Sequence, residues 1–506
     1  MQNLATSTKQ SWLVWFLKGI LILGALVLLA RVVELQIIKG NYFYSLAEDN
    51  RIRHIPITAP RGEIYARGGE ILAGNTNVQN FKNDVQISEW KRTYPLGSGF
   101  AHVSGYLGEI NPQEAGKVDP GCTDKGPRTQ GLLTGRGGLE EQYECVLRGI
   151  DGEELVEVDT FGKKIRTLGT KNSISGNNLQ TTIDYGLQQK VSEVMRQKGA
   201  VVVTDGYGEI LALYSHPSFD PFNIEKYLTN PNLPLFNRVI SGAYHPGSLF
   251  KLVTAASALS EGKIDKNFTY DDQGVIKVNE FEYNNWFFTQ YGKTEGLINL
   301  KKALARSTDT FFYKIGEFVG PDVLASWANK FGLGNLTNID LPGEISGLVP
   351  SPDWKRQYKN ENWFLGNTYH MSIGQGDLTA SPLQANLMTS VIANGGKFCK
   401  PHIKQTSEPP VCADLDLSSE DLDQIKQGML QACLSGGTGY PFFDFTPQIA
   451  CKTGTAETEI EDKTHAWFTA FAQDIVVTVL VEKGGEGSSV AAPIAKDILN
   501  YWFHER

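Results

Sequence analysis

The sequence predicts an α+β protein in which an antiparallel sheet is covered by helices, preceded by a strand-rich module and a single transmembrane helix. Three observations support this: one long apolar stretch near the N-terminus, β-like runs with turn signals in residues 40–168, and strands at both ends of residues 179–506 with helical stretches between them. The 506 residues suffice for two or three folded units. A formal net charge of −9 offers no basic surface, so we expect no nucleic-acid partner.

The membrane anchor is expected at residues 12–34. From Trp12 to Ala30 the only charged residue is Lys18, and about 19 apolar residues suffice for a tilted helix across a hydrocarbon layer of roughly 30 Å. Leu28 at the −3 position of a cut after Ala30 disfavours a cleaved signal peptide, and a buried core helix is the other alternative. Basic residues flank the stretch on both sides, so the charge pattern leaves its orientation open.

Residues 40–168 form the predicted strand-rich module. The run IRHIPI (52–57) is typical of a short strand, and Arg67-Gly68-Gly69 indicates a turn. The polar, glycine-punctuated stretch GTKNSISGNN (169–178) predicts a linker. A second folded unit is therefore expected from residue 179 onward.

Residues 179–506 begin and end with apolar runs typical of hairpin strands, and the segments between them have helical periodicity. A sheet covered by helices follows from this order. The expected elements are a strand at 179–184, a helix at 187–198, two strands within 200–215, helices at 248–261 and 299–318, strands at 465–472 and 475–482, and a helix at 491–503.

The cysteines and histidines give no metal or redox motif. Six cysteines are scattered without CxxC spacing, and the eight histidines form no HExxH-like cluster. We therefore expect no bound metal and no cofactor. Disulfides joining Cys122 to Cys145 and Cys399 to Cys412 are possible, and unpaired thiols are the alternative, because spacing does not fix connectivity.

The strongest chemical signal is an SxxK motif, Ser248-Leu249-Phe250-Lys251. Pro246 and Gly247 precede it and an apolar, alanine-rich run follows, so Ser248 is expected in the first turn of a helix. Residues at i and i+3 share a helix face, which brings the amine near the hydroxyl. A serine nucleophile needs a neighbouring base, and Lys251 fits that role if burial and a second cation lower its pKa.

Two further motifs follow in order. Ser307-Thr308-Asp309 is an SxD motif, in which Ser307 is expected to relay a proton and Asp309 to orient Lys251. The KTG motif then supplies a second cation, Lys452, which is also expected to attract a substrate carboxylate. The remaining expected substrate-binding residues are Thr453 and Thr455, through their hydroxyls, and Gly454, which would keep an edge strand slim enough to pair with an extended peptide.

The ordered set of motifs is more specific than any one of them. Other SxxK matches occur at Ser88 and Ser260, and further SxD matches occur elsewhere, but KTG occurs once. Neither alternative SxxK serine has a Pro-Gly pair before it and an apolar helix after it. A plain helix N-cap at Ser248 is the alternative that this order disfavours.

The chain resembles the class B penicillin-binding proteins over nearly its whole length. SIGQG (372–376) and an SxD motif in place of SxN are similar to the elongation or rod-shape subgroup. The other segments that carry the resemblance are APRGEIYARGGEILAGN (59–75), GLEEQYECVLRGIDG (138–152), NRVISGAYHPGSLFK (237–251), FGLGNLTNIDLPGEISGLVPS (331–351), CKTGTAE (451–457) and HAWFTAFA (465–472).

The resemblance implies a peptidoglycan D,D-transpeptidase that cross-links stem peptides through a serine acyl-enzyme during cell-wall synthesis and cell-shape maintenance. It implies a penicillin-binding, serine β-lactamase-like transpeptidase domain at 179–506 and a dimerisation-type pedestal at 40–168. Ser248 would be acylated by a D-alanyl-D-alanine end or by a β-lactam, with Lys251 as base and Ser307 and Lys452 assisting the departing D-alanine. The N–H groups of Ser248 and Thr455 would form the oxyanion hole.

The resemblance also implies a location and a partner. The transpeptidase domain would lie outside the cytoplasm, anchored by a single pass through the cytoplasmic membrane, with residues 1–11 as a cytoplasmic tail. The implied partner is a polytopic membrane glycosyltransferase of the shape, elongation, division and sporulation family.

The chain departs from the family pattern at three points. Ala66 replaces an acidic residue, which puts a local salt bridge in doubt, and Cys451 stands where a small residue is usual, so a buried small side chain is expected there. The region before the transpeptidase domain is short, which would reduce partner contacts. Some relatives hold zinc between the SxxK and SxD motifs, but residues 252–306 contain no Cys or His, so no zinc site is expected.

Two other functions remain open on these residues. A D,D-carboxypeptidase or β-lactamase of the same fold would use water as acceptor. A non-catalytic β-lactam or peptidoglycan sensor would bind without turnover. The anchor, the strand-rich module and the length of the chain favour the cross-linking enzyme.

Overall fold

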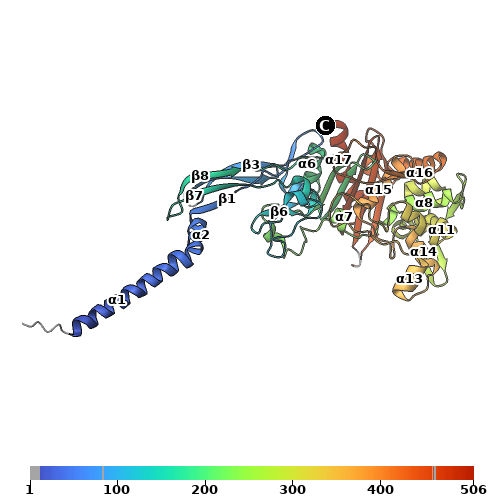
Figure 1. Cartoon of the computed structure of the whole chain (residues 1–506). Coiled ribbons are helices and arrows are strands. Elements are labelled where there is room, and N and C mark those ends of the chain that lie inside the picture. Colours follow the sequence, from blue (N-terminus) through green and yellow to red (C-terminus); the bar gives the residue numbers. More distant parts are fainter. Residues whose placement is uncertain (1–11, 83–84, 459, 461–462) are drawn as a thin grey trace, which may run out of the picture. The chain divides into compact units, whose positions relative to one another are not determined.

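The computed structural model describes residues 12–82, 85–458, 460 and 463–506 (Figure 1). By packing, the chain divides into two compact units that interleave along the sequence. The first comprises Met1–Pro60, Asn77–Lys91 and Gly149–Ser175, and the second comprises Arg61–Thr76, Arg92–Arg148 and Gly176–Arg506. The expected module at 40–168 is thus shared between both units, and the expected tail at 1–11 lies outside the described residues.

The first unit contains the expected apolar helix. Helix α1 (Trp12–Val33) continues through a π-helical turn, Glu34–Ile38, and is followed by α2 (Gly40–Arg51). None of the residues of α1 is buried, as expected for a helix that is apolar all round and contacts lipid. Within the described part of the chain, Trp12–Ile38 is the one helix long and apolar enough to cross a membrane, with a mean hydropathy of 2.5.

The first unit also contains a three-stranded antiparallel sheet in the order β1-β7-β8. The predicted strand at IRHIPI is confirmed as β1 (Ile52–Ile57), which pairs with β7 (Gly152–Val158). Strand β8 (Lys164–Lys171) pairs with β7 and includes the first three residues of the stretch expected as a linker. The linker prediction is therefore wrong at 169–171, because backbone pairing in a sheet needs no apolar run.

The second unit is built on a five-stranded antiparallel sheet in the order β11-β10-β20-β19-β18. The two predicted hairpins are confirmed: β10 with β11 near the start of the unit and β19 with β20 near its end. They pair with each other through β10 and β20, which leaves β18 at the sheet edge. The bounds are β10 (Gly199–Thr204), β11 (Ile210–His216), β18 (Ala450–Glu457), β19 (Thr464–Ala472) and β20 (Ile475–Val481).

Helices cover both faces of this sheet (Figure 1). Because side chains alternate along a strand, Val201 and Val203 of β10 pack with α6 (Tyr185–Val194) and α17 (Ala492–Asn500). Ala200 and Val202 face the other side, toward the core that contains α8 (Lys251–Ser260) and α15 (Pro382–Ala393). The predicted α+β layering is confirmed, with α15 on the sheet and α8 packed against α11 (Asp309–Val319), α12 (Pro321–Lys330) and α16 (Ser419–Ala432).

The helix predicted at 299–318 is two helices. α10 (Leu300–Arg306) ends at Ser307, which has a left-handed backbone with φ of 56°, and α11 begins at Asp309 and runs to Val319. Thr308 N donates to Ala303 O at 3.0 Å, the hydrogen bond that terminates a helix after a left-handed residue. The prediction was wrong because serine, unlike glycine, gives no signal for this conformation.

The remaining elements lie between or beside these. In chain order they are β2 (Ile64–Tyr65), β3 (Ile71–Lys82), β4 (Val85–Thr93), α3 (Ala101–Ser104), β5 (Tyr106–Glu109), β6 (Leu133–Arg136), α4 (Gly138–Gln142), α5 (Glu144–Leu147), β9 (Leu179–Gln180), α7 (Arg238–Ser241), β12 (Thr269–Asp272), β13 (Val275–Val278), β14 (Phe281–Asn284), α9 (Trp286–Tyr291), β15 (Gly296–Asn299), α12 (Pro321–Lys330), α13 (Pro352–Lys359), α14 (Leu365–Ser372), β16 (Lys397–Cys399), β17 (Cys412–Asp414) and α16 (Ser419–Ala432).

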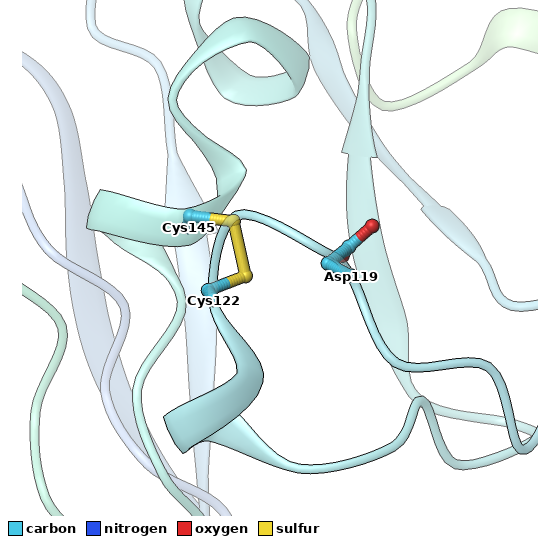
Figure 2. Close-up of side chains that lie close together, drawn as sticks. All are labelled: Asp119, Cys122 and Cys145. Carbon is cyan, nitrogen blue, oxygen red and sulfur yellow. A yellow bond between two sulfur atoms is a disulfide. The ribbon is translucent and has the colours of Figure 1, made fainter.

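All six cysteines are in disulfides. Both pairs that the spacing allowed are present, and a third joins Cys433 to Cys451, so the alternative of unpaired thiols is wrong. Among the described residues, Asp119 lies with Cys122 and Cys145 close enough to suggest a metal site, but Figure 2 shows the two sulfur atoms bonded to each other. Since a cysteine binds a metal ion as a thiolate, the disulfide-bonded pair gives no sign of a metal site here.

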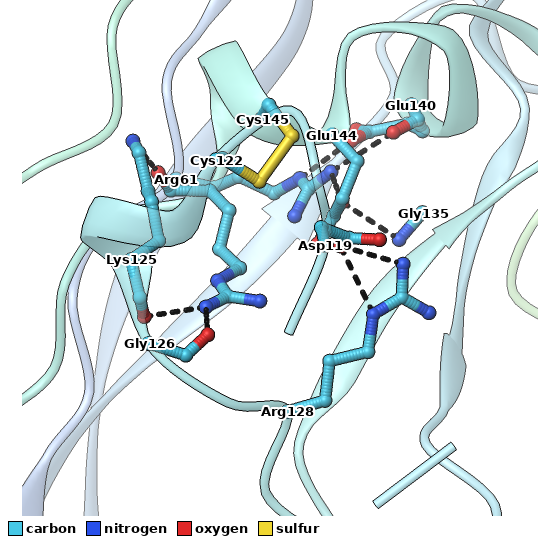
Figure 3. The surroundings of a disulfide bond; sticks show 11 residues. Arg61, Asp119, Cys122, Lys125, Gly126, Arg128, Gly135, Glu140, Glu144 and Cys145 are labelled. Carbon is cyan, nitrogen blue, oxygen red and sulfur yellow. Dashed lines mark hydrogen bonds and ion pairs between the residues drawn. A yellow bond between two sulfur atoms is a disulfide. The ribbon is translucent and has the colours of Figure 1, made fainter. Parts of the chain in front are cut away.

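An arginine cluster in the second unit replaces the salt bridge that Ala66 put in doubt. Arg61 donates to Glu140 at 2.6 Å and also bonds Glu144, as Figure 3 shows. Arg92 donates to the other oxygen of Glu140 at 2.7 Å. These side chains are almost fully buried, and Ala66 is buried among apolar residues instead of pairing. The segment 59–75 thus keeps ion pairs through Arg61.

Candidate active site

The turn that holds Ser248 lies against the KTG strand. Ser248 is half-buried in a 3₁₀ turn, Gly247–Leu249, that leads directly into α8, close to the helix start that the sequence predicted. Gly247 has a φ of +55°, and a Cβ there would come within 2.9 Å of Thr455 O. Glycine therefore allows both the left-handed turn and the close approach to β18. Trp467 Nε1 fixes the preceding loop by donating to His245 O at 3.0 Å.

Lys251 joins the first two motifs. Its side chain is fully buried, and its Nζ donates to Asp309 Oδ1 at 2.7 Å, to Ser307 O at 2.8 Å and to Ser307 Oγ at 3.2 Å. In the part of the chain that is described, Ser248 is not among the hydrogen-bond partners of this amine. Catalytic hydrogen bonds are often long before substrate binds, so the amine and the hydroxyl remain candidate partners.

Lys452 joins the third motif to the same serine. Its Nζ donates to Ser307 Oγ at 2.8 Å and to Thr453 O at 2.8 Å, and its side chain is also fully buried. Ser307 Oγ thus lies between two lysine amines. The left-handed backbone that places it there is unusual for a residue other than glycine, and such strain is concentrated at functional sites.

Burial lowers the pKa of both lysines. Desolvation lowers the pKa of Lys251, while the Asp309 carboxylate opposes this shift. Desolvation and then the neighbouring Lys251 ammonium lower the pKa of Lys452 well below the usual value, again opposed by Asp309. One carboxylate therefore faces two buried amines, and the repulsion between them favours a state in which one amine is neutral.

The KTG strand β18 lies at the sheet edge, as the sequence predicted, and presents hydroxyls there. Thr455 is exposed, and Thr453 Oγ1 donates to Thr438 Oγ1 at 2.8 Å. A Cβ at Gly454 would meet the Trp467 Cβ at 2.9 Å and approach Leu249, so glycine is required here for packing against the nucleophile turn. That reason differs from the room for substrate that the sequence suggested.

A cleft of about 520 Å³ opens over these residues. Ser248, Ser307, Asp309, Thr453 and Thr455 all line it, while the amines of Lys251 and Lys452 lie beneath its wall. The structure therefore brings all three motifs to one cavity, although they are far apart in sequence. The rest of the lining is formed by Glu282, Tyr283, Asn284, Trp286, Thr289, Gln290, Tyr313, His370, Ile373, Gln375, Thr438, Glu457, Thr464, Glu486 and Ser488.

Sequence reasoning missed three residues that hold the motifs in place. Asn285 accepts from Asp309 N at 3.1 Å, Trp286 N donates to Asp309 Oδ2 at 3.1 Å, and Thr438 bonds Thr453. The glycine-rich stretch around Thr438 was a weak signal of a tight loop. For Asn285 and Trp286 the sequence carries no signal, because their partner Asp309 lies 24 and 23 residues away.

Two family models match the chain. The penicillin binding protein transpeptidase domain matches residues 199–500, which include all the candidate site residues, and the penicillin-binding protein dimerisation domain matches residues 84–181.

Curated relatives match over nearly the full chain. The peptidoglycan D,D-transpeptidase MrdA of Acinetobacter baumannii is 31% identical, over 97% of this chain and 88% of the relative. MrdA of Haemophilus influenzae is also 31% identical, over 96% of this chain and 91% of the relative.

Solved structures have the same fold. PBP2 of Pseudomonas aeruginosa in complex with WCK 5153 has a TM-score of 0.76 and 31% identity, over 89% of this chain and 97% of that one. PBP2 of Helicobacter pylori, solved as a complex with MreC, has a TM-score of 0.76 and 26% identity, over 89% of this chain and 99% of that one. The chain therefore belongs to the class B penicillin-binding proteins, in their elongation subgroup, and is a peptidoglycan D,D-transpeptidase of cell-wall synthesis.

Proposed function

We propose that the chain cross-links peptidoglycan by a serine acyl-enzyme mechanism in which Ser248 is the nucleophile. The observation that supports this most directly is the hydrogen-bonded group of Lys251, Ser307, Asp309 and Lys452 beneath the cleft that Ser248 lines. Ser248 Oγ attacks the carbonyl of the penultimate D-alanine, its proton passes to Lys251, and the terminal D-alanine leaves. An amine of a second stem peptide then attacks the acyl-enzyme and frees Ser248 Oγ.

The buried amines suit both halves of this reaction. A neutral Lys251 can accept the proton of Ser248, and burial favours that neutral form. The departing amine of D-alanine needs a proton, and Ser307 Oγ, bonded to Lys452 Nζ, is placed to pass one on. Asp309 holds Lys251 through its 2.7 Å bond.

The KTG strand is the proposed substrate-binding edge. An extended stem peptide can pair with the free edge of β18 at Gly454, and the hydroxyls of Thr453 and Thr455 can bond its terminal carboxylate. The N–H groups of Ser248 and Thr455 are the proposed oxyanion hole, and the close contact of Gly247 with Thr455 O supports their proximity.

Treatment with penicillin is expected to give a single covalent adduct on Ser248, because the opened β-lactam stays esterified to the nucleophile. Peptide mass spectrometry of the full-length protein checks this, and an adduct on any other residue overturns the assignment. The lifetime of the adduct separates a transpeptidase from a hydrolase of the same fold. Release of the penicilloyl group within seconds would point to a β-lactamase.

We further propose that α1 anchors the chain in the cytoplasmic membrane with the transpeptidase domain on the outer side, since the substrate lies there. A membrane-impermeant fluorescent penicillin is then expected to label the protein in intact spheroplasts. Labelling that requires lysis contradicts this orientation.

The H. pylori PBP2–MreC complex and the solved peptidoglycan synthase complex support a shape-related assembly as partner, with a membrane glycosyltransferase of the shape, elongation, division and sporulation family as the proposed member. Co-purification from solubilised membranes tests that membership, and its absence contradicts it.

A further inference from the structure

We propose that Asp272 and Asn285, which lie outside all three motifs, are positioning residues that aim Asp309 at Lys251. The inference rests on the proposed role of Lys251 as the base that activates Ser248. Both residues belong to the segment between the SxxK and SxD motifs, at the ends of strands β12 and β14. Neither touches the substrate cleft, and both side chains are fully buried.

Asp272 is the centre of a buried hydrogen-bond cluster. Its Oδ1 accepts from Gly274 N at 2.9 Å and from Thr310 Oγ1 at 2.6 Å, and its Oδ2 accepts from Glu295 N at 2.8 Å and from Asn285 Nδ2 at 3.3 Å. In all four bonds the Asp272 oxygens accept. A buried side chain with four donors holds those donors in place, since losing one of the bonds leaves a buried polar atom unsatisfied.

Asn285 carries this cluster to the active site. Its side-chain amide donates to Asp272, and its carbonyl Oδ1 accepts from Asp309 N at 3.1 Å. The two bonds require opposite ends of the amide, so they fix its orientation. Its backbone N also donates to Gly274 O at 2.8 Å, which holds the start of α9 against the same turn.

The result is a carboxylate whose two oxygens have different partners. Trp286 N, next to Asn285, donates to Asp309 Oδ2 at 3.1 Å, and this leaves Oδ1 to accept from Lys251 Nζ at 2.7 Å. Thr310, the residue after Asp309, is held by Asp272. Asp309 is thus held at its backbone, at one oxygen and at the next residue, and only Oδ1 is left for the amine.

The competing explanation is that this cluster only stabilises the segment 269–299. The pH dependence of acylation separates the two. Asp309 raises the pKa of Lys251 against the effect of burial, so a displaced Asp309 lets that pKa fall further. The neutral base then forms at lower pH. The acid limb of the pH–rate profile of acylation, in which the rate falls as the pH falls, therefore moves to lower pH.

Asn285→Ala is therefore expected to move the acid limb of penicillin acylation to lower pH and to reduce the plateau rate roughly 10- to 100-fold, because the base is misplaced. In an Asp309→Asn background the same change is expected to add little, since the two act through one contact. Asp272→Asn, which keeps the side-chain volume, is expected to shift the acid limb in the same direction. It provides the test if Asn285→Ala does not fold.

Asn386→Ala is the matched control. Asn386 is equally buried and hydrogen-bonds Thr204, Val202 O and Val476 O on strands β10 and β20, so its loss is expected to lower the melting temperature without moving the pH profile. An unmoved acid limb in Asn285→Ala, or a full additive effect with Asp309→Asn, overturns the proposal. A failure of the proposed base itself can be distinguished from this. If Lys251 is not the base, the Lys251→Met protein keeps the acid limb of the wild-type protein.

Discussion

Replacing Ser248 with alanine is expected to abolish penicillin attachment and the cross-linking of stem peptides, with a loss of acylation rate of at least about 10⁴-fold. The fold should survive, because the contacts that hold the turn do not involve the Ser248 side chain. Gly247 N donates to Gly374 O at 2.9 Å, and Trp467 Nε1 donates to His245 O at 3.0 Å. Gel detection of a fluorescent penicillin and a cross-linking assay measure the two losses.

Ser260→Ala is the matched control for this prediction. Ser260 begins one of the other SxxK matches, and it lies exposed at the far end of the same helix α8. Its replacement is expected to leave penicillin labelling unchanged. If Ser248→Ala still supports normal cell shape when it is the only copy, the chain acts as a sensor or scaffold and not through catalysis.

Much of the second unit follows from local sequence. Strands β10 and β20 are continuous apolar runs bounded by turns, and a strand buried on both faces needs that composition. The start of the nucleophile helix follows from Pro246-Gly247 before an apolar run. The membrane helix is equally plain, because length and apolarity alone define it.

The parts that escaped prediction depend on partners far along the chain. The break at Ser307 is only weakly marked locally, since Leu300–Arg306 is rich in good helix formers and the low helix propensity of Thr308 and Asp309 does not by itself end a helix. It exists because Ser307 must meet Lys251, 56 residues before it, and Lys452, 145 residues after it. The Cys433–Cys451 disulfide also depends on the fold, because it joins the residue after the end of α16 to the strand β18 that contains the KTG motif.

The sequence predicted which residues form the candidate site, but it did not predict how the charges of the two lysines affect each other. Order and spacing brought Ser248, Ser307 and Lys452 together as candidates. The sequence suggested that Lys452 would act as a cation that lowers the pKa of Lys251. In the structure burial lowers the pKa of Lys251, and it is the pKa of Lys452 that is lowered by burial and then by the charge of Lys251. How a buried pair shares its charge depends on distances that no sequence pattern gives.

Replacing Lys251 with methionine is expected to reduce the acylation rate about 10²- to 10⁴-fold and to remove the acid limb of its pH profile. In the wild-type protein, burial disfavours the ammonium, so neutral Lys251 and the rate should appear at a lower pH than an ordinary lysine would allow. Methionine fills a similar apolar volume but cannot accept the proton of Ser248. Loss of the Lys251 charge removes one of the two causes that lower the pKa of Lys452, while burial, the larger cause, remains.

Lys355→Met is the matched control for this change. Lys355 is also buried, with 6% of its surface exposed, but its amine bonds Asn367 and Glu361 away from the cleft. Its replacement is expected to lower the melting temperature and to leave the acylation rate and its acid limb unchanged. Stopped-flow acylation between pH 5 and 10 measures both variants. An acid limb that persists in Lys251→Met at its wild-type position would assign the base to another group, and Lys452 would be the first to examine because its amine donates to Ser307 Oγ, which lines the same cleft.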